Sequence, residues 1–445
     1  MESIEEKIKN FARSQGVEVV GVAGPERLNG PPSMDPTYTM RGAKSIVSMA
    51  IPQNVEAIYT FLSKKSPMPH NLDQLLSNQR THRVSKNLAE FIVSLGHKAR
   101  VVPPNNTYRR SPDVFATHPS FSHRFGAIAA GIAAQGWSGN VMTKEYGAAM
   151  YLGTVVTDAM LKSDPAIHPR YFIDNYCSKC KLCEKVCVGG MFDEKEEENV
   201  LINDEMHPRG KRLNIDFCNA SCFGLHSLSR DKKWTTWGKH WIKEWTDRMP
   251  GPSEKKYIRR TFLKKGATAG DSTLRYDLIR RLGSLLWPEE WIKEMPAMEN
   301  LPDDELERNK IIGEYAKRIG VVGLKDFNVL TCGQCAMICG PTVDETADRY
   351  HTLIESGLVV PGPEGRMVNA GTYEEALEIR KKYPRKVSRD EMIKDSRASL
   401  ILWHKYYFGI EPRSIIQGIF YNRKLKKALK KIKHGYEPAT PKNRE

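Results

Sequence analysis

Closely spaced cysteines are the feature that most constrains this 445-residue chain. Four lie within eleven residues, three within eight, and two more lie between these groups: Cys177, Cys180, Cys183, Cys187, Cys218, Cys222, Cys332, Cys335 and Cys339. Such clusters suit metal ligation in a reducing compartment better than disulfide bonds. Zinc favours groups of the Cys-x2-Cys type in pairs and would leave a pattern of four, one and three ligands unexplained. The spacing therefore predicts iron–sulfur clusters.

The first group has the spacing Cys-x2-Cys-x2-Cys-x3-Cys of bacterial ferredoxins. Three thiolates with this spacing bind one cubane cluster, and the fourth binds the other cluster. Two [4Fe-4S] clusters need eight thiolates, so the eighth ligand is Cys218 or Cys222. We expect one cluster on Cys177, Cys180, Cys183 and Cys339, and the other on Cys187, Cys332, Cys335 and either Cys218 or Cys222.

Helix and strand patterns alternate over the first 160 residues. Ser3 and Glu6 form a capping box ahead of an amphipathic helix that runs to about Ser14. Apolar segments at 17–23, 45–51 and 97–102 predict strands, and 75–95 predicts a helix. This alternation predicts an α/β or α+β domain through about residue 160.

Glycines and small residues gather just before the first cysteine group. A Gly-Trp-x-Gly motif begins at Gly136, Thr-x-Glu-Tyr-Gly begins at Thr143, and Leu-Gly-x-Val-x-Thr-Asp covers 152–158. Glycines let a backbone approach a large flat ligand, although tight packing of a helix on a sheet explains them as well. Together with the cysteine spacing, the order of these motifs resembles the corrinoid-dependent reductive dehalogenases and epoxyqueuosine reductases. The resemblance covers about 1–222 and 325–345.

The resemblance implies a nitroreductase-like core that holds a base-off cobamide, fused to a ferredoxin-like module with two [4Fe-4S] clusters. The implied function is a reductase in which electrons pass through the clusters to the corrinoid. The corrinoid would then remove halide or another leaving group from a small organic substrate. Carried over by motif, the residues that contact the cobamide are Gly136, Trp137, Gly139, Asn140, Thr143, Tyr146 and Gly147.

Departures from the family motifs keep two other functions open. Ala148 and Ala149 follow the Glu-Tyr-Gly turn where dehalogenases continue with Pro-Arg, which leaves an iron–sulfur electron-transfer protein without corrinoid as an alternative. Epoxyqueuosine reductases have an aspartate proton donor near the position of Ser120. A tRNA-modifying reductase is therefore favoured by net charge alone.

A proton donor is expected in the loop before the glycine-rich segment, where the candidates are Tyr108, His118 and His123. Family chemistry favours a tyrosine, so Tyr108 leads. Each candidate also has a structural explanation: a packed loop tyrosine, a turn residue before Pro119, and an exposed residue at a helix N-terminus, respectively.

The net charge of +15 suggests anionic partners, and seven basic residues of this excess lie in the tail at 423–433. Within 408–433, apolar residues at helical spacing form the opposite face of the same predicted helix. The tail is a helix packed on its own domain, a helix on an anionic membrane surface, or a non-specific binder of tRNA, and nucleic acid is the least favoured partner. A ferredoxin-like or membrane-associated protein is the expected electron donor.

No apolar run is long enough to span a membrane, and the N-terminus has no targeting signal. We therefore expect a cytoplasmic protein, with the tail as a peripheral contact on the inner face of the membrane. The expected domains are an α/β core at 1–160, a ferredoxin-like module at 161–222 and 331–345, a Trp-rich helical insertion at 223–330 and a helical C-terminal region at 346–445. Packing in a core is the expected role of Trp234, Trp237, Trp241 and Trp245.

Overall fold

A four-stranded antiparallel sheet forms the centre of the N-terminal half. The computed structural model describes residues 2–102, 119–213, 218, 221, 227–237, 332–363 and 367–383. In the sheet, β1 (Val19–Ala23), β2 (Ser45–Pro52), β6 (Met150–Thr157) and β3 (Ala99–Val101) lie in the order β1-β2-β6-β3. Strands β2 and β6 pair over their full length, from Ser45 opposite Thr157 to Pro52 opposite Met150.

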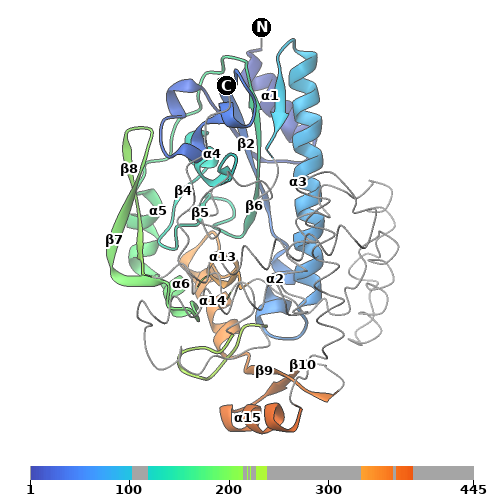
Figure 1. Cartoon of the computed structure of the whole chain (residues 1–445), viewed down its shortest axis with the longest axis vertical. Helices are drawn as coiled ribbons and strands as arrows, with labels where there is room; N and C mark the ends of the chain where they lie inside the picture. Colours follow the sequence, from blue (N-terminus) through green and yellow to red (C-terminus); the bar gives the residue numbers. More distant parts are fainter. Residues whose placement is uncertain are drawn as a thin grey trace, which may run out of the picture.

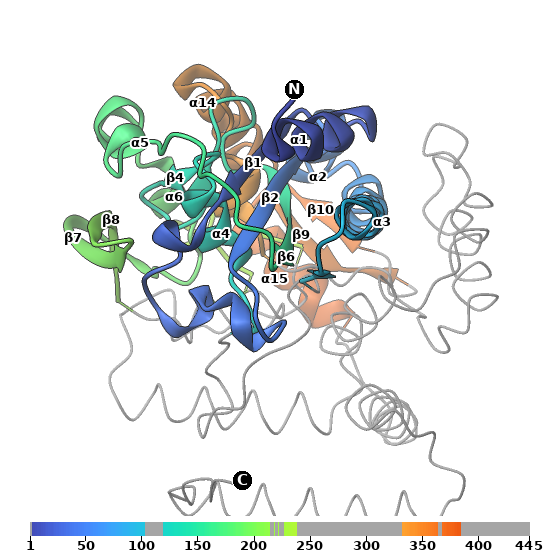
Figure 2. The same cartoon turned by 90° about the horizontal axis from the view of Figure 1, so that it is seen from above.

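Helices cover both faces of this sheet (Figures 1 and 2). Alternate β2 residues such as Val47 and Met49 pack against α1 (Ile4–Ser14) and α3 (Met68–Ser94). Ile46, one position away on the same strand, packs on the other side with α4 (His123–Ala129). This period of two is what a strand buried on both faces requires. The predicted mixed α/β architecture is confirmed.

Most predicted elements of this half lie where the sequence placed them. The Ser3 side chain accepts a hydrogen bond from the Glu6 amide at 3.2 Å, so the predicted cap opens α1. Strand β6 was not predicted, because Gly153 and two threonines weaken its apolar pattern. A Cβ at Gly153 would lie only 2.8 Å from the Thr81 methyl group of α3. The glycine therefore lets α3 lie close to the sheet.

The cysteine-bearing segments pack against the core from one end. They comprise α5 (Tyr171–Asn175), a short 3-10 helix (Cys177–Lys179), α6 (Leu182–Lys185), α13 (Gln334–Met337) and α14 (Val343–Ile354). Side chains from α2 (Val55–Leu62), α13 and α14 share one apolar cluster, and Tyr59 of α2 donates a hydrogen bond to Asp348 of α14. Helices α6 and α13 are about 150 residues apart in sequence, yet they lie side by side (Figure 1).

A long hairpin projects beside the module, made of β7 (Phe192–Ile202) and β8 (Glu205–Arg212). The sequence predicts no strand within 161–222, so this hairpin was not predicted. Acidic residues fill the first half of β7, and such residues are depleted in strands. The hairpin is set by its two-residue turn, Asn203-Asp204, in which both residues have positive φ.

The remaining elements complete the described chain. They are β4 (Ala134–Gln135), β5 (Val141–Met142), β9 (Leu358–Pro361), β10 (Met367–Ala370), α15 (Tyr373–Lys382) and short 3-10 helices at Pro25–Arg27, Pro32–Met34 and Pro36–Tyr38. Trp234 and Trp237 are buried, as expected for core packing. Trp241, Trp245 and the basic tail lie outside the described residues. Within the described chain, no helix has both the length and the apolar character to cross a bilayer.

Candidate iron–sulfur site

The two cysteine segments repeat one local backbone. Lys181 and Gly333, each directly after a cysteine, have φ of 49° and 61° in the left-handed region. Each is followed by a four-residue helix, α6 or α13, that carries the next cysteine, Cys183 or Cys335. A further cysteine, Cys187 or Cys339, lies two residues after the end of each helix. The left-handed residue reverses the chain so that the two cysteines on either side of it can bind one cluster.

Four cysteines from both segments line one cavity, and they are the four that the spacing assigned to one cluster: Cys177, Cys180, Cys183 and Cys339. Trp137, Ser138 and Met142 of the α/β core complete the wall on one side. The Cys339 residue comes from the C-terminal segment, so the cavity needs both parts of the module.

The other cysteines begin to form a second group. Cys187 lies close enough to Cys335 for the charge of that neighbour to raise its pKa. The Cys332 thiol donates to Oε1 of Gln334 at 2.6 Å. Cys218 lies beside Arg212 at the end of β8, where its thiolate would favour the charged guanidinium. Cys222 is outside the described residues, so the choice between the two stays open.

Burial keeps these thiols protonated unless a cation compensates them. It raises the pKa of Cys177 and of Cys187 to about 11. Burial also raises the pKa of Cys183 well above its ordinary value, and the neighbouring thiolates of Cys177 and Cys339 add to this shift. Bound iron supplies such a cation. An all-thiolate donor set is the one that [4Fe-4S] clusters use. The donor set fits iron–sulfur clusters.

Hydrogen-bond donors point at cysteine sulfurs of both groups. The Trp137 amide donates to Sγ of Cys177 at 3.4 Å, and Nδ2 of Asn140 donates to Sγ of Cys335 at 3.3 Å. The Met191 amide donates to Sγ of Cys187 at 3.3 Å. Such donors stabilise negative charge on sulfur and raise a cluster's reduction potential. A single turn of the α/β core thus contacts both cysteine groups.

The Thr-x-Glu-Tyr-Gly motif, which ends at Gly147, packs directly on the cysteine loops. Gly147 has φ of 60°, and a Cβ there would overlap the carbonyl oxygens of Cys339 and Gly340. The Ala148 amide donates to the Cys339 carbonyl at 3.0 Å. The motif's last glycine is therefore required for the core to contact the module.

The other motif residues also contact protein. Trp137 is only 3% exposed, and the Lys181 ammonium lies 3.6 Å from the centre of its ring. Thr143 is buried and accepts a hydrogen bond from the Tyr146 amide, whereas the Tyr146 hydroxyl points toward Glu18. A Cβ at Gly136 would lie 2.6 Å from Sδ of Met142. Each of these residues has a contact within the protein, and their contact with a cobamide stays a prediction.

Of the three proton-donor candidates, the structure describes one. His123 begins α4, as expected, but it is buried instead of exposed, and its Nδ1 lies 2.8 Å from Oγ1 of Thr154 on β6. Ser120 is buried nearby. Tyr108 and His118 lie outside the described residues, and the catalytic role of all three stays a prediction.

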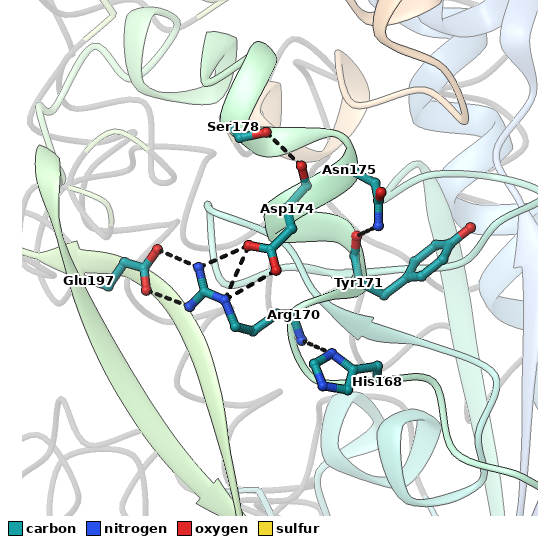
Figure 3. A network of polar contacts seen from close by, with 7 residues as sticks. All are labelled: His168, Arg170, Tyr171, Asp174, Asn175, Ser178 and Glu197. Carbon is teal, nitrogen blue, oxygen red and sulfur yellow. Dashed lines mark hydrogen bonds and ion pairs between the residues drawn. The ribbon is translucent and has the colours of Figure 1, made fainter.

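A polar network holds the segment that leads into Cys177 (Figure 3). The Arg170 guanidinium bridges two carboxylates: it contacts Asp174 of α5 at 2.9 Å and Glu197 of β7 at 2.9 Å. The Ser178 hydroxyl donates to the Asp174 carbonyl at 2.7 Å. The network therefore joins the first cysteine loop to the hairpin.

Two sets of charged residues at this site were not predicted. Lys64, in the loop after α2, is 7% exposed, and its ammonium donates to Ser356 and to the Leu62 carbonyl. Arg209 and Arg212 on β8 lie near the glycine motif. No periodic pattern marks Lys64, but the basic run at the end of β8, opposite the acidic run of β7, was a readable signal for the arginines.

The fold and the site define a class: an antiparallel α/β core whose glycine motif contacts a module of two paired cysteine segments. Among curated proteins, the chain is 27% identical over 207 residues to an epoxyqueuosine reductase of Atelocyanobacterium thalassa (isolate ALOHA). The match covers 42% of this chain and spans 63% of that relative's length. It confirms the predicted resemblance to the epoxyqueuosine reductases and their relatives. No family model matches the chain.

Solved structures of both kinds of reductase resemble the chain distantly. A catabolic reductive dehalogenase is 14% identical, with a TM-score of 0.39, over 63% of this chain and 37% of its own. The epoxyqueuosine reductase of Streptococcus thermophilus is 15% identical, with a TM-score of 0.32, over 80% of this chain and 99% of its own. These values are too low to support further conclusions.

Proposed function

We propose that the chain is a reductase that transfers single electrons through two [4Fe-4S] clusters to a substrate site on its α/β core. The observation that supports it most directly is the cavity shared by Cys177, Cys180, Cys183 and Cys339, with Cys187 and Cys335 next to each other beyond it. These ligands come from both cysteine segments, as two clusters with exchanged fourth ligands require. The sequence match to an epoxyqueuosine reductase supports the reductase class.

Bound here, the clusters would supply one-electron transfer. The protein's own part is to hold eight thiolates, to donate hydrogen bonds to their sulfurs and to exclude water. Trp137 covers the first group, while Asn140 donates to the second. Because both belong to one turn of the core, they connect the module to the α/β domain over a short distance.

The substrate and the electron acceptor are the finer parts of the proposal. By resemblance, the acceptor is a cobamide held by the core, and the reaction removes halide or another leaving group from a small organic molecule. The protein's task in that reaction is to deliver a proton from a side chain of the sequence before the glycine-rich segment, with Tyr108 as the first candidate. A ferredoxin-like or membrane-associated donor would reduce the clusters.

A tRNA-modifying reductase is the second candidate, and the match to an epoxyqueuosine reductase favours it. Ser120 argues against it, because a buried hydroxyl at the expected aspartate position is a far weaker acid than a carboxyl group. An electron-transfer protein without corrinoid is the third candidate. It is favoured because Trp137, Thr143 and Tyr146 all contact other protein groups.

One set of measurements separates the three. The full chain, purified without oxygen after expression with added corrinoid, is analysed for iron, sulfide and cobalt and then assayed with halogenated aromatic compounds and with an epoxyqueuosine-containing tRNA stem loop. We expect about eight irons per chain, about one cobalt, and reduction of the halogenated compounds. Eight irons without cobalt would support the electron-transfer protein, and reduction of the stem loop alone would support the tRNA enzyme. Cys180→Ser, with one cluster lost, is the inactive control.

A further inference from the structure

Three arginines from two separate elements converge on the turn of the glycine motif. Arg124 of α4 donates through Nη1 to the Gly139 carbonyl at 3.4 Å. A Cβ at Gly139 would overlap Nη2 of Arg212 and would lie 3.1 Å from Cδ of Arg209, both on β8. Gly139 has φ of 67°, so the turn itself favours glycine there. The turn thus packs against a cluster of three arginine side chains, Arg124, Arg209 and Arg212.

The charge of this group is poorly balanced within the described chain. Glu198 forms an ion pair with Arg209, with Nε and Oε1 2.7 Å apart. The Arg212 Nε atom is buried and has no hydrogen-bond partner among the described residues. Burial and the charges of Arg209 and Arg124 lower the pKa of Arg212 to about 10, although the nearby Cys218 and Glu198 oppose this shift. A guanidinium that is largely withdrawn from water beside two others is unfavourable without a negative partner.

Two other arginines of the described module have carboxylate partners. Arg170 has carboxylates on both sides (Figure 3). The buried Arg349 contacts the Glu345 carboxylate and donates to the Met337 carbonyl, although its Nε, like that of Arg212, has no partner among the described residues. Each of these two arginines has a carboxylate partner, whereas none of the ion pairs found among the described residues involves Arg212.

We propose that Arg212, with Arg209 and Arg124 at its sides, binds an oxyanion group, either a carboxylate or a phosphate. The planar guanidinium fork matches two oxygens of such a group, and Arg124 is exposed, so the site opens to solvent. The site lies on the turn whose next residue, Asn140, donates to Sγ of Cys335. An anionic ligand held here would lie beside the cysteine module.

The test measures binding of inorganic phosphate and of benzoate to the anaerobically purified, iron-loaded full chain by calorimetry at low salt. We expect saturable binding of at least one of the two, which separates a phosphate from a carboxylate ligand. Arg212→Gln should weaken it at least about tenfold, because a lost charged hydrogen bond has an effect of that size. Lys195→Gln, an equal loss of charge at an exposed position of the same hairpin, should leave binding unchanged.

Iron content and circular dichroism show whether each variant folds. If Arg212→Gln fails to fold, Arg124→Gln replaces it, and we expect a several-fold weakening from the more exposed position. The absence of saturable binding by the wild-type protein, or equal binding by the wild-type protein and both arginine variants, would overturn the proposal. So would a change in cluster potential in Arg212→Gln without any anion binding, because the guanidinium would then serve the cluster.

Discussion

At the scale of single residues, the thiol groups account for most of what was predictable. The Cys-x2-Cys spacing alone predicts which thiols of a segment bind the same cluster. In the structure, a left-handed residue lies between Cys180 and Cys183 and between Cys332 and Cys335. Cys218 illustrates the limit of this reasoning. A lone ligand has no spacing partner, so nothing in the sequence separates it from Cys222.

Replacing each of these two cysteines by serine identifies the eighth ligand. We expect only one of the two variants to lose about four irons per chain, because the second cluster needs one further thiolate. Iron analysis and electron paramagnetic resonance (EPR) spectra check this. Full iron in both variants would show that the count of eight thiolates is wrong.

Lys64 predicts a pH dependence of stability. Burial lowers its pKa from 10.5 to about 7, and the Cys332 thiolate opposes this shift. Between these two values the unfolded state binds a proton at Lys64 that the folded state lacks. The free energy of unfolding therefore rises with pH from about 7 to 10.5, by on the order of 1 kcal/mol per pH unit. An anionic cluster on Cys332 would move the start of this window to higher pH.

Urea denaturation of wild type and Lys64→Met between pH 7 and 10 measures this contribution. We expect the wild-type protein to gain more stability with rising pH than the variant, because methionine has no proton to lose. Lys65→Met, at the exposed neighbouring position, is the control and should follow the wild type. Parallel curves for wild type and Lys64→Met would contradict the assignment.

At the scale of elements, contacts between the core and the module depend on close backbone approach. Gly147 and Gly42 both have positive φ, but a Cβ at Gly42 meets nothing within 4 Å. We expect Gly42→Ala to cost about 1 kcal/mol through its backbone alone. Gly147→Ala should cost more and should also lower iron content, because the Cys339 loop must move. Denaturation midpoints and iron analysis compare the two, and equal losses would show that Gly147 is only a turn residue.

The same contacts explain which elements could be predicted. Helix α1 and strand β2 have local signals, a capping box and an apolar run, and both appear as expected. Strand β6 contains Gly153, which is needed because helix α3 packs closely against it. The apolar pattern of β6 is therefore not recognisable from the neighbouring residues alone. The acidic β7 is a strand only because β8 pairs with it. Tertiary contacts decide such elements, and a single sequence does not display them.

At the scale of the whole molecule, the basic tail is the segment expected to bind an anionic partner such as a membrane surface. Truncation after Tyr421 removes the seven basic residues at 423–433. We expect the truncated protein to keep its iron and to lose binding to anionic liposomes at low salt, since each basic residue contributes on the order of 1 kcal/mol. A flotation assay with neutral liposomes as control measures this. Equal binding by the two proteins would remove the membrane from the proposal.

The central claim is that each cluster takes ligands from both cysteine segments, 150 residues apart. EPR spectra of the reduced protein test it most directly, with Cys177→Ser, Cys339→Ser and Cys187→Ser compared at equal protein concentration. The structure predicts that Cys177→Ser and Cys339→Ser lose the same cluster signal, because both line one cavity, and that Cys187→Ser loses the other. Loss of one common signal in Cys177→Ser and Cys187→Ser, with Cys339→Ser different, would contradict it.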